Sequence, residues 1–163
     1  MNKINLINQT KMKAKYFIPF LAIGVLYAFA FRSSTPDPVL NLNGTWKLIS
    51  GTEISNGVKT VTDYTKDQQM IKIINDTHFA FLKHKLGTAK DSSNDFDAGG
   101  GPYSLKGDQY TEHLDYYSNK SVEGNAFTFA VTIKGDTLIQ QGVEKLKGGG
   151  AEKIIFEKYV KVK

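Results

Sequence analysis

The stretch YSLKGDQYTEHLDYY, residues 103–117, decides the fold because it reads as two β-strands joined at Gly107-Asp108. Gly at the first central position of a two-residue hairpin turn accepts the positive φ that such a turn requires. The same arrangement recurs in IKGDTL, residues 133–138, where Gly135-Asp136 separates two runs typical of strands. The chain is therefore expected to contain at least two antiparallel hairpins.

Runs rich in Val, Ile, Thr, Phe and Tyr continue on both sides of these hairpins, separated by Gly, Asn and Asp. This spacing indicates an all-β protein, and a turn at Asn75-Asp76-Thr77 joins two more neighbouring strands. Closing such an up-and-down sheet into a barrel removes its edges. We therefore predict an up-and-down antiparallel β-barrel of about eight to ten strands. The predicted strands are 44–53, 57–64, 68–74, 78–84, 101–106, 109–117, 125–134, 137–143 and 152–161.

The alternation of side chains along a strand assigns a face to each residue of the opening stretch. With the turn at Gly107-Asp108, Tyr103 pairs with Glu112 and Leu105 with Tyr110, and paired residues share a face. This face continues through Leu114 and Tyr116 and is apolar or aromatic apart from Glu112, so it should face the barrel interior. The opposite, polar face contains Ser104, Lys106, Gln109, Thr111, His113, Asp115 and Tyr117.

The other two turns predict their registers in the same way. The turn at Gly135-Asp136 pairs Ile133 with Leu138 and turns inward Phe127, Phe129, Val131, Ile133, Leu138, Gln140 and Gly142. A three-residue loop at Asn75-Asp76-Thr77 pairs Ile73 with Phe79 and Ile71 with Phe81, and it turns these four residues inward.

The predicted interior is rich in aromatic residues, and two interpretations of it remain open. It is either a packed core whose few polar groups bond to one another or to water, or a cavity with orienting polar groups, as in small-molecule sites. A barrel of this kind is wide enough for one small ligand. The candidate ligand-binding residues are Trp46, Phe79, Phe81, Tyr103, Tyr110, Glu112, Tyr116, Phe127, Phe129 and Gln140.

Glu112 is the polar residue of this interior most in need of a partner, because a carboxylate on an apolar face is costly unless it is paired or neutralised. Three roles are open for it. It is a structural residue bonded to Tyr hydroxyls or to a Lys at the barrel end, a contact for a polar or cationic ligand group, or a general acid or base. No second catalytic group is evident near it in the sequence.

The sequence contains no recognisable catalytic, phosphate-binding or metal-binding motif. His78, His84 and His113 lack the spacing of metal ligands, and each is expected to be solvated. The Gly runs at 99–101 and 148–150 suit a bend entering a strand and a hairpin loop. We predict no catalytic residue, no metal and no cofactor.

The first 30 residues have the layout of a secretory signal. A segment with four Lys and no acidic residue precedes the apolar run YFIPFLAIGVLYAFAF, residues 16–31. Small residues at Ala28 and Ala30 allow cleavage after Ala30, and an uncleaved membrane anchor is the alternative. Met12 is a possible true start. Segments 1–30, 31–41 and 42–163 are interpreted as leader, linker and barrel domain.

Charge and cysteine content restrict the possible partners. Outside the leader, 17 basic and 16 acidic residues almost cancel, so the domain has no bulk basic surface for nucleic acid. The chain has no Cys, which excludes disulfides, thiolate metal sites and lipoprotein acylation. An exported monomer in the periplasm, cell envelope or medium is expected, with membrane contact only through an uncleaved leader.

The segment NGTWKLIS, residues 43–50, resembles the first strand of a lipocalin, in which the Trp of Gly-x-Trp plugs the closed end of the barrel. Many lipocalins pack a basic residue against this Trp, and Lys161 or Lys158 takes that place by resemblance. Residues 43–163 also resemble small exported lipocalin-like proteins of unknown function from Bacteroidetes-type bacteria. The segments that carry this likeness are GTWKL, IKIINDTHFAF, GGGPYSLKGDQYTEHLDYYSN, FTFAVTIKGDTL and FEKYVKV.

The sequence supports two main hypotheses of function. The first is a non-enzymatic protein that binds a small hydrophobic or amphipathic molecule inside the barrel. The second is an envelope-associated structural or interaction module with a filled barrel and loops 53–69, 85–98 and 118–124 as its working surface. An enzyme that uses Glu112 is a third and weaker hypothesis.

Overall fold

The computed structural model describes residues 40–87 and 96–163, and in these ranges it contains strands and turns but no helix. No helix in these ranges has the length and hydropathy needed to cross a bilayer. The leader and the centre of the loop predicted at 85–98 lie outside the described residues. The strands are β1 (Gly44–Ser55), β2 (Val58–Asp63), β3 (Gln68–Ile74), β4 (His78–Lys85), β5 (Asp97–Lys106), β6 (Gln109–His113), β7 (Tyr116–Tyr117), β8 (Ala126–Lys134), β9 (Thr137–Glu144) and β10 (Lys153–Lys161).

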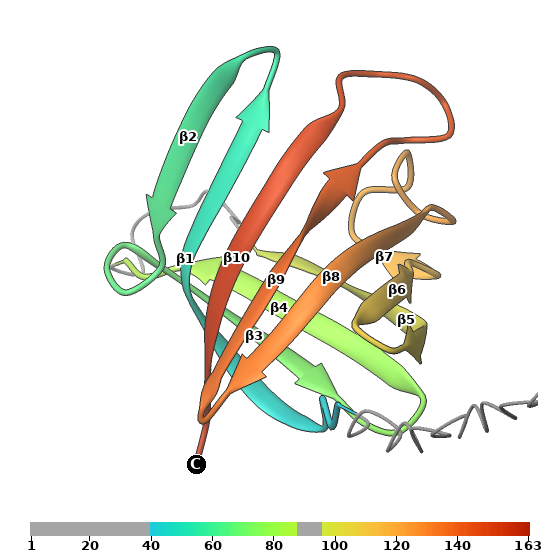
Figure 1. Ribbon diagram of the computed structural model, residues 1–163. Coiled ribbons are helices and arrows are strands. Elements are labelled where there is room, and N and C mark those ends of the chain that lie inside the picture. The colour runs from blue at the N-terminus through green and yellow to red at the C-terminus, as the bar shows by residue number, and fades with distance from the viewer. Residues whose placement is uncertain (1–39, 88–95) are drawn as a thin grey trace, which may run out of the picture. The chain divides into compact units, whose positions relative to one another are not determined.

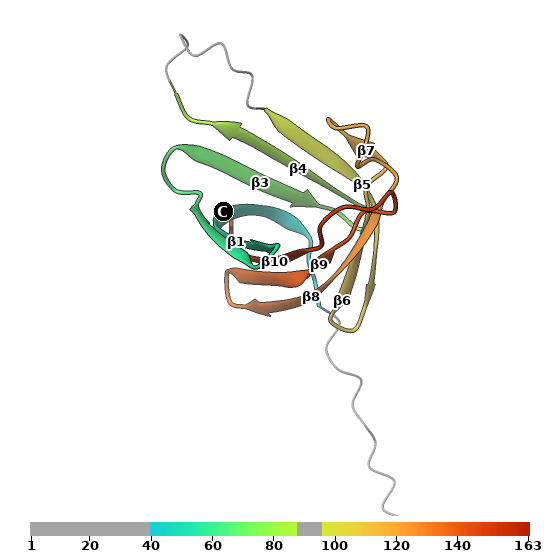
Figure 2. The same cartoon turned by 90° about the horizontal axis from the view of Figure 1, so that it is seen from above.

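Eight of these strands close into an antiparallel ring. The order is β10-β9-β8-β6-β5-β4-β3-β1, and β1 pairs with β10 to complete it. Among the described strands, β2 pairs with β1 alone and extends one wall, whereas β7 pairs with β5. Figure 2 shows β3 and β4 on one side of the ring and β8 and β9 on the other. The predicted all-β, up-and-down antiparallel barrel is confirmed.

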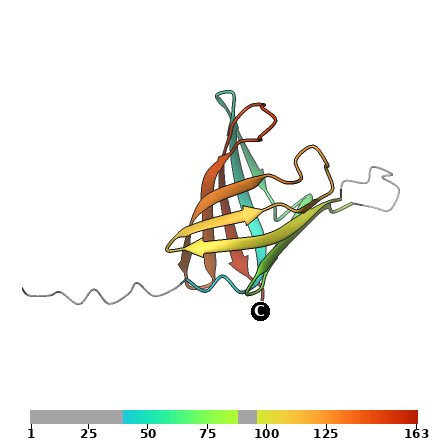
Figure 3. The ribbon, with the colours of Figure 1, turned by 90° about the vertical axis from the view of Figure 1, so that its right-hand side faces the viewer.

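The barrel has two different ends. The β1–β2 hairpin and the β9–β10 connection project from one end, called the mouth below, and the C-terminus lies at the other, called the closed end (Figures 1 and 3). At the closed end the Trp46 indole donates a hydrogen bond to the Leu42 carbonyl over 2.8 Å. The Lys161 ammonium lies 5.2 Å from the centre of the indole ring, so Lys161 takes the place of the basic residue expected against the Trp.

Both Gly-Asp hairpins have the predicted register. Tyr103 pairs with Glu112 across the first, and Ile133 pairs with Leu138 across the second. Gly107 and Gly135 have positive φ of 62° and 57°, the conformation for which Gly was inferred at these turns. The interior faces predicted for β6 and β8 follow from these registers, and Tyr110 and Phe129 are buried on them.

The β3–β4 register differs from the prediction by one residue. Ile74, rather than Ile73, pairs with Phe79. The cause is the Asn75 side chain, whose Oδ1 accepts hydrogen bonds from the backbone N–H groups of Thr77 and His78 over 2.9 and 2.8 Å. This Asx-type turn leaves Asp76 and Thr77 as the two central residues.

A one-residue shift moves every side chain of a strand to the other face of the sheet. The prediction that Ile71 and Ile73 face inward is therefore wrong, and Ile73 is exposed. The residues that β3 buries are Met70, Lys72 and Ile74. Lys72 thus enters the interior of the barrel.

The strand predicted for residues 109–117 is interrupted after His113. The Asp115 N–H bonds to the His113 carbonyl over 3.0 Å, and this tight turn breaks the alternation before β7 begins. The prediction that Tyr116 faces inward is wrong, because Tyr116 is 71% exposed. Tyr117, predicted to face solvent, instead packs against Phe81 with ring centres 5.7 Å apart.

Packed side chains fill the barrel toward its closed end. Trp46, Tyr110, Tyr159 and Phe129 are at most 1% exposed, and they belong to one apolar cluster. Close packing of this kind leaves little room for a ligand. Of the two interpretations of the interior, the packed core therefore describes this half of the barrel.

Candidate binding sites in the barrel

The most buried polar group of the barrel is formed by Lys72, Glu112 and Gln140, from β3, β6 and β9. The Lys72 ammonium donates to Glu112 Oε1 over 2.5 Å and to Gln140 Oε1 over 3.0 Å. All three residues are buried, and Lys72 is only 2% exposed. This is the structural role considered for Glu112, with a Lys as its partner, although that Lys lies within the barrel rather than at its end.

Aromatic rings surround this ion pair. The Lys72 ammonium lies 5.3 Å from the ring centre of Tyr159 and 5.9 Å from those of Phe79 and Tyr110. A cation held over ring faces gains further stabilisation when it is desolvated. Lys72 therefore has a carboxylate, an amide and three rings as partners, an arrangement that fixes it as a structural residue.

The Tyr110 hydroxyl differs from the hydrogen-bonded polar groups around it. Tyr110 is fully buried, and its oxygen has no hydrogen-bond partner among the described residues. Burial, followed by the nearby Glu112 carboxylate, raises the pKa of Tyr110. The phenol thus remains neutral. Tyr103, which pairs with Glu112 across the hairpin, donates its hydroxyl to the Asn75 carbonyl over 2.9 Å.

The mouth contains a small polar pocket, called the mouth pocket below. Its volume is about 190 Å³, and it is lined by Gly51, Thr52, Glu53, Thr60, Thr62, Tyr64, Ile155 and Glu157. An irregularity in β1 between Leu48 and Ser50 sets its position. Beyond it, Gly51 pairs with Thr62 on one side and with Glu157 on the other, so these positions share a face.

Two carboxylates near the mouth have raised pKa values. Burial, followed by the Glu157 and Glu112 carboxylates, raises the pKa of Glu144 to about 7. Burial also raises the pKa of Glu157, although Lys72 and a 2.6 Å hydrogen bond from the Tyr159 hydroxyl act in the opposite direction. The mouth therefore concentrates acidic groups whose burial makes them costly to ionise.

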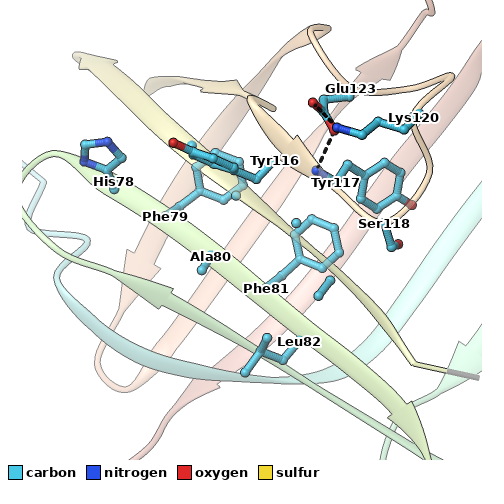
Figure 4. A pocket seen from close by; sticks show the side chains of 14 residues that line it. His78, Phe79, Ala80, Phe81, Leu82, Tyr116, Tyr117, Ser118, Lys120 and Glu123 are labelled. Atoms are coloured by element: carbon cyan, nitrogen blue, oxygen red, sulfur yellow. Dashed lines mark hydrogen bonds and ion pairs between the residues drawn. The ribbon is translucent and has the colours of Figure 1, made fainter.

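A larger and more open groove lies where β4, β5 and β7 meet (Figure 4). Its volume is about 590 Å³, and its lining is mainly apolar. The Gly run 99–101 forms part of it, with Phe79 and Phe81 from β4 and the two Tyr of β7. At one end Lys120 pairs with Glu123 over 2.8 Å. The groove thus offers apolar surface but no unpaired charge at that end.

The structure brings most of the predicted site residues together inside the barrel. Glu112 and Gln140 meet through Lys72, and Tyr103 and Tyr110 have ring centres 5.2 Å apart. The predicted residues that belong to or pack against the core cluster are Trp46, Phe79, Phe81, Tyr103, Tyr110, Phe127 and Phe129. Tyr116 lies outside this group. Whether any of these residues binds a ligand stays a prediction.

Sequence reasoning missed Lys72, Glu144 and Glu157. A signal for Glu157 was present, because it lies between Ile155 and Tyr159 at alternate positions, as Glu112 lies between Tyr110 and Leu114. The predicted β3–β4 register placed Lys72 on the outer face of the sheet, so its burial was not expected. Among the described residues, no group of three or more His, Cys, Asp or Glu side chains could hold a metal ion.

Comparison with known proteins identifies no family for the chain. No protein-family model and no curated protein matches it. A similar solved structure is zebrafish ileal bile acid-binding protein complexed with cholic acid, with 16% identity and a TM-score of 0.30 over 74% of this chain and 98% of that chain. At this level of similarity the fold assignment rests on the strand pairing of the protein itself.

Proposed function

We propose that this protein binds a small amphipathic molecule, without catalysis, in the half of the barrel nearest its mouth. The observation that carries this proposal is the mouth pocket, which adjoins a tightly filled core. Concave sites with apolar walls and a few convergent polar groups are typical of small-molecule binding. The mouth pocket combines Ile155 and the Tyr64 ring with carboxylates and Thr hydroxyls.

The proposal predicts that a bulky residue placed in the mouth pocket blocks binding. Thr62 on β2 lines the pocket, and Val61 beside it is on the opposite face and 64% exposed. Thr62→Trp is expected to weaken binding of the neutral dye Nile red by about tenfold or more, whereas Val61→Trp leaves it unchanged. Fluorescence titration measures both affinities. A wild-type protein that binds no dye, or equal losses in the two variants, would contradict the proposal.

The second candidate function is an interaction module, and the outer face of β3, β4 and β5 favours it. Strand alternation places Ile73, Ala80 and Gly100 on this face, and Tyr116 pairs with Gly100 beside them. Ile73 and Tyr116 are exposed. Segment 53–69 was predicted to be a loop of the working surface, but most of it is strand. The apolar outer face is therefore the better candidate surface for an uncharged protein partner. Absence of small-molecule binding would favour this candidate.

We also propose that the protein is exported and that its leader is removed. The basic segment, the apolar run 16–31 and the small residues Ala28 and Ala30 support this. Protein isolated from the envelope or medium of its natural cells is expected to begin at Phe31 when its intact mass is measured. A mass that includes residues 1–30 would instead identify an uncleaved anchor.

Membership of the small exported lipocalin-like proteins is part of the same proposal. Gly44 and Trp46 with Lys161 over the indole ring support a lipocalin-like closure, because this is the feature that the lipocalin resemblance implies. The closure also explains why position 44 is Gly, since a Cβ there would come within 2.9 Å of Lys161 Cε.

A further inference from the structure

We infer that the ligand group recognised in the mouth pocket is an organic cation, an alkylammonium or related amine, held by the carboxylate of Glu157. This inference rests on the proposed function and specifies the chemical class of its ligand.

Glu157 has one oxygen in use and one available. Its Oε2 accepts the Tyr159 hydroxyl over 2.6 Å. Within residues 40–87 and 96–163, no group donates a hydrogen bond to its Oε1. Glu157 lines the pocket together with Thr62 and Tyr64. An ammonium group has several N–H donors, so it can bond to this oxygen and to neighbouring hydroxyls at once.

The charges around the mouth also favour a cation. Lys72 is paired with Glu112 over 2.5 Å and Lys153 with Glu53 over 3.1 Å. In the described part of the chain, Glu144 and Glu157 have no cationic partner within salt-bridge distance. Two carboxylates that repel each other are stabilised by a positive charge placed near them. An anion in the same position would instead add to the repulsion.

The lining of the pocket favours an organic cation over a metal ion. The described residues contain no cluster of three or more metal-ligating side chains. Ile155 and the Tyr64 ring supply apolar and aromatic wall, which suits the alkyl groups and charge of an amine. Complete drug-sized ligands occupy sites of about 300–1,000 Å³. A pocket of about 190 Å³ therefore fits a head group, whose apolar tail extends beyond it.

A matched set of three eight-carbon probes tests this inference: octylammonium, octanol and octanoate, each titrated by calorimetry into the full-length protein. Octylammonium is expected to bind about tenfold or more tightly than octanol, the effect of a charge-assisted hydrogen bond, and octanoate least tightly. Glu157→Gln should remove this preference, so that octylammonium and octanol bind with similar affinity. Glu152→Gln is the matched control, because Glu152 is exposed and pairs with Lys145 outside the pocket.

The pH dependence of the unaltered protein gives a second readout that needs no variant. Glu144 interacts with Glu157 and Lys153 on β10, Glu112 on β6, Lys72 on β3 and Tyr117 on β7. Since the pKa of Glu144 is about 7, its carboxylate gains charge as the pH rises through neutrality. Affinity for octylammonium should rise between about pH 6 and 8, where the amine stays protonated, and affinity for octanol should stay constant.

The outcomes separate the inference from the proposed function. Equal binding of octylammonium and octanol, with no pH dependence of the former, would overturn the cation inference and leave small-molecule binding standing. If none of the three probes binds, the proposed function fails as well. Loss of the ammonium preference in Glu157→Gln but not in Glu152→Gln supports both the cation inference and the proposed small-molecule binding.

Discussion

Replacing Lys72 with Met is expected to lower the free energy of unfolding by about 3–5 kcal/mol, the cost of leaving a buried charge without its partner. The Lys72 ammonium is the cation bonded to Glu112, over 2.5 Å, and Glu112 is only 7% exposed. Met fills the space of the Lys stem but leaves the carboxylate uncompensated beside the Tyr110 ring. Urea unfolding, followed by circular dichroism and Trp46 fluorescence, measures the loss.

Two further variants isolate the buried charge as the cause. Lys145→Met removes an exposed ion pair with Glu152, which is 2.7 Å long, and should cost only about 0–1 kcal/mol. The double variant Lys72→Met/Glu112→Leu should recover most of the loss, because apolar residues often replace a buried ion pair without penalty. A small loss in Lys72→Met, or no recovery in the double variant, would contradict this account.

The fold was predictable from local sequence signals, whereas the buried ion pair between Lys72 and Glu112 was not. The Gly-Asp turns specified two registers because their backbone conformation selects Gly at a fixed position. The turn at Asn75 allowed two registers between β3 and β4, and the apolar side chains of Ile71 and Ile73 favoured the wrong register. The burial of Lys72 depends on Glu112, 40 residues further along the chain. No local pattern near β3 contains that information.

The candidate site was predictable only in part for a similar reason. The faces of β6 and β8 followed from their turns, so Tyr110, Glu112 and Phe129 were placed correctly inside. The mouth pocket depends on an irregularity in β1 between Leu48 and Ser50, which moves Gly51 onto the inner face. Such bulges change a strand's alternation without a strong sequence signal. The position of Tyr116 was missed because the turn after His113 shifts the alternation in the same way.

Gly101→Ala is expected to be the second strongly destabilising substitution, with a loss of about 3 kcal/mol, the upper end of the usual cost of overpacking, because the clash cannot relax easily. A Cβ at this position would lie 2.0 Å from the His113 carbonyl oxygen and 2.9 Å from the Asp115 N–H nitrogen. Both atoms belong to backbone, so no side-chain rotation relieves the clash. Strand β5 must move away from the tight turn after His113, next to its pairing with β6. Urea unfolding measures the loss.

Gly148→Ala is the matched control for the effect of the added methyl group itself. A Cβ at Gly148 meets no atom within 4 Å, so the free energy of unfolding should change by less than about 0.5 kcal/mol. If Gly101→Ala is as stable as this control, β5 and the turn after His113 are not in close contact. A large loss in Gly101→Ala alone would show that β5 needs a residue without a Cβ where it meets the backbone of His113 and Asp115.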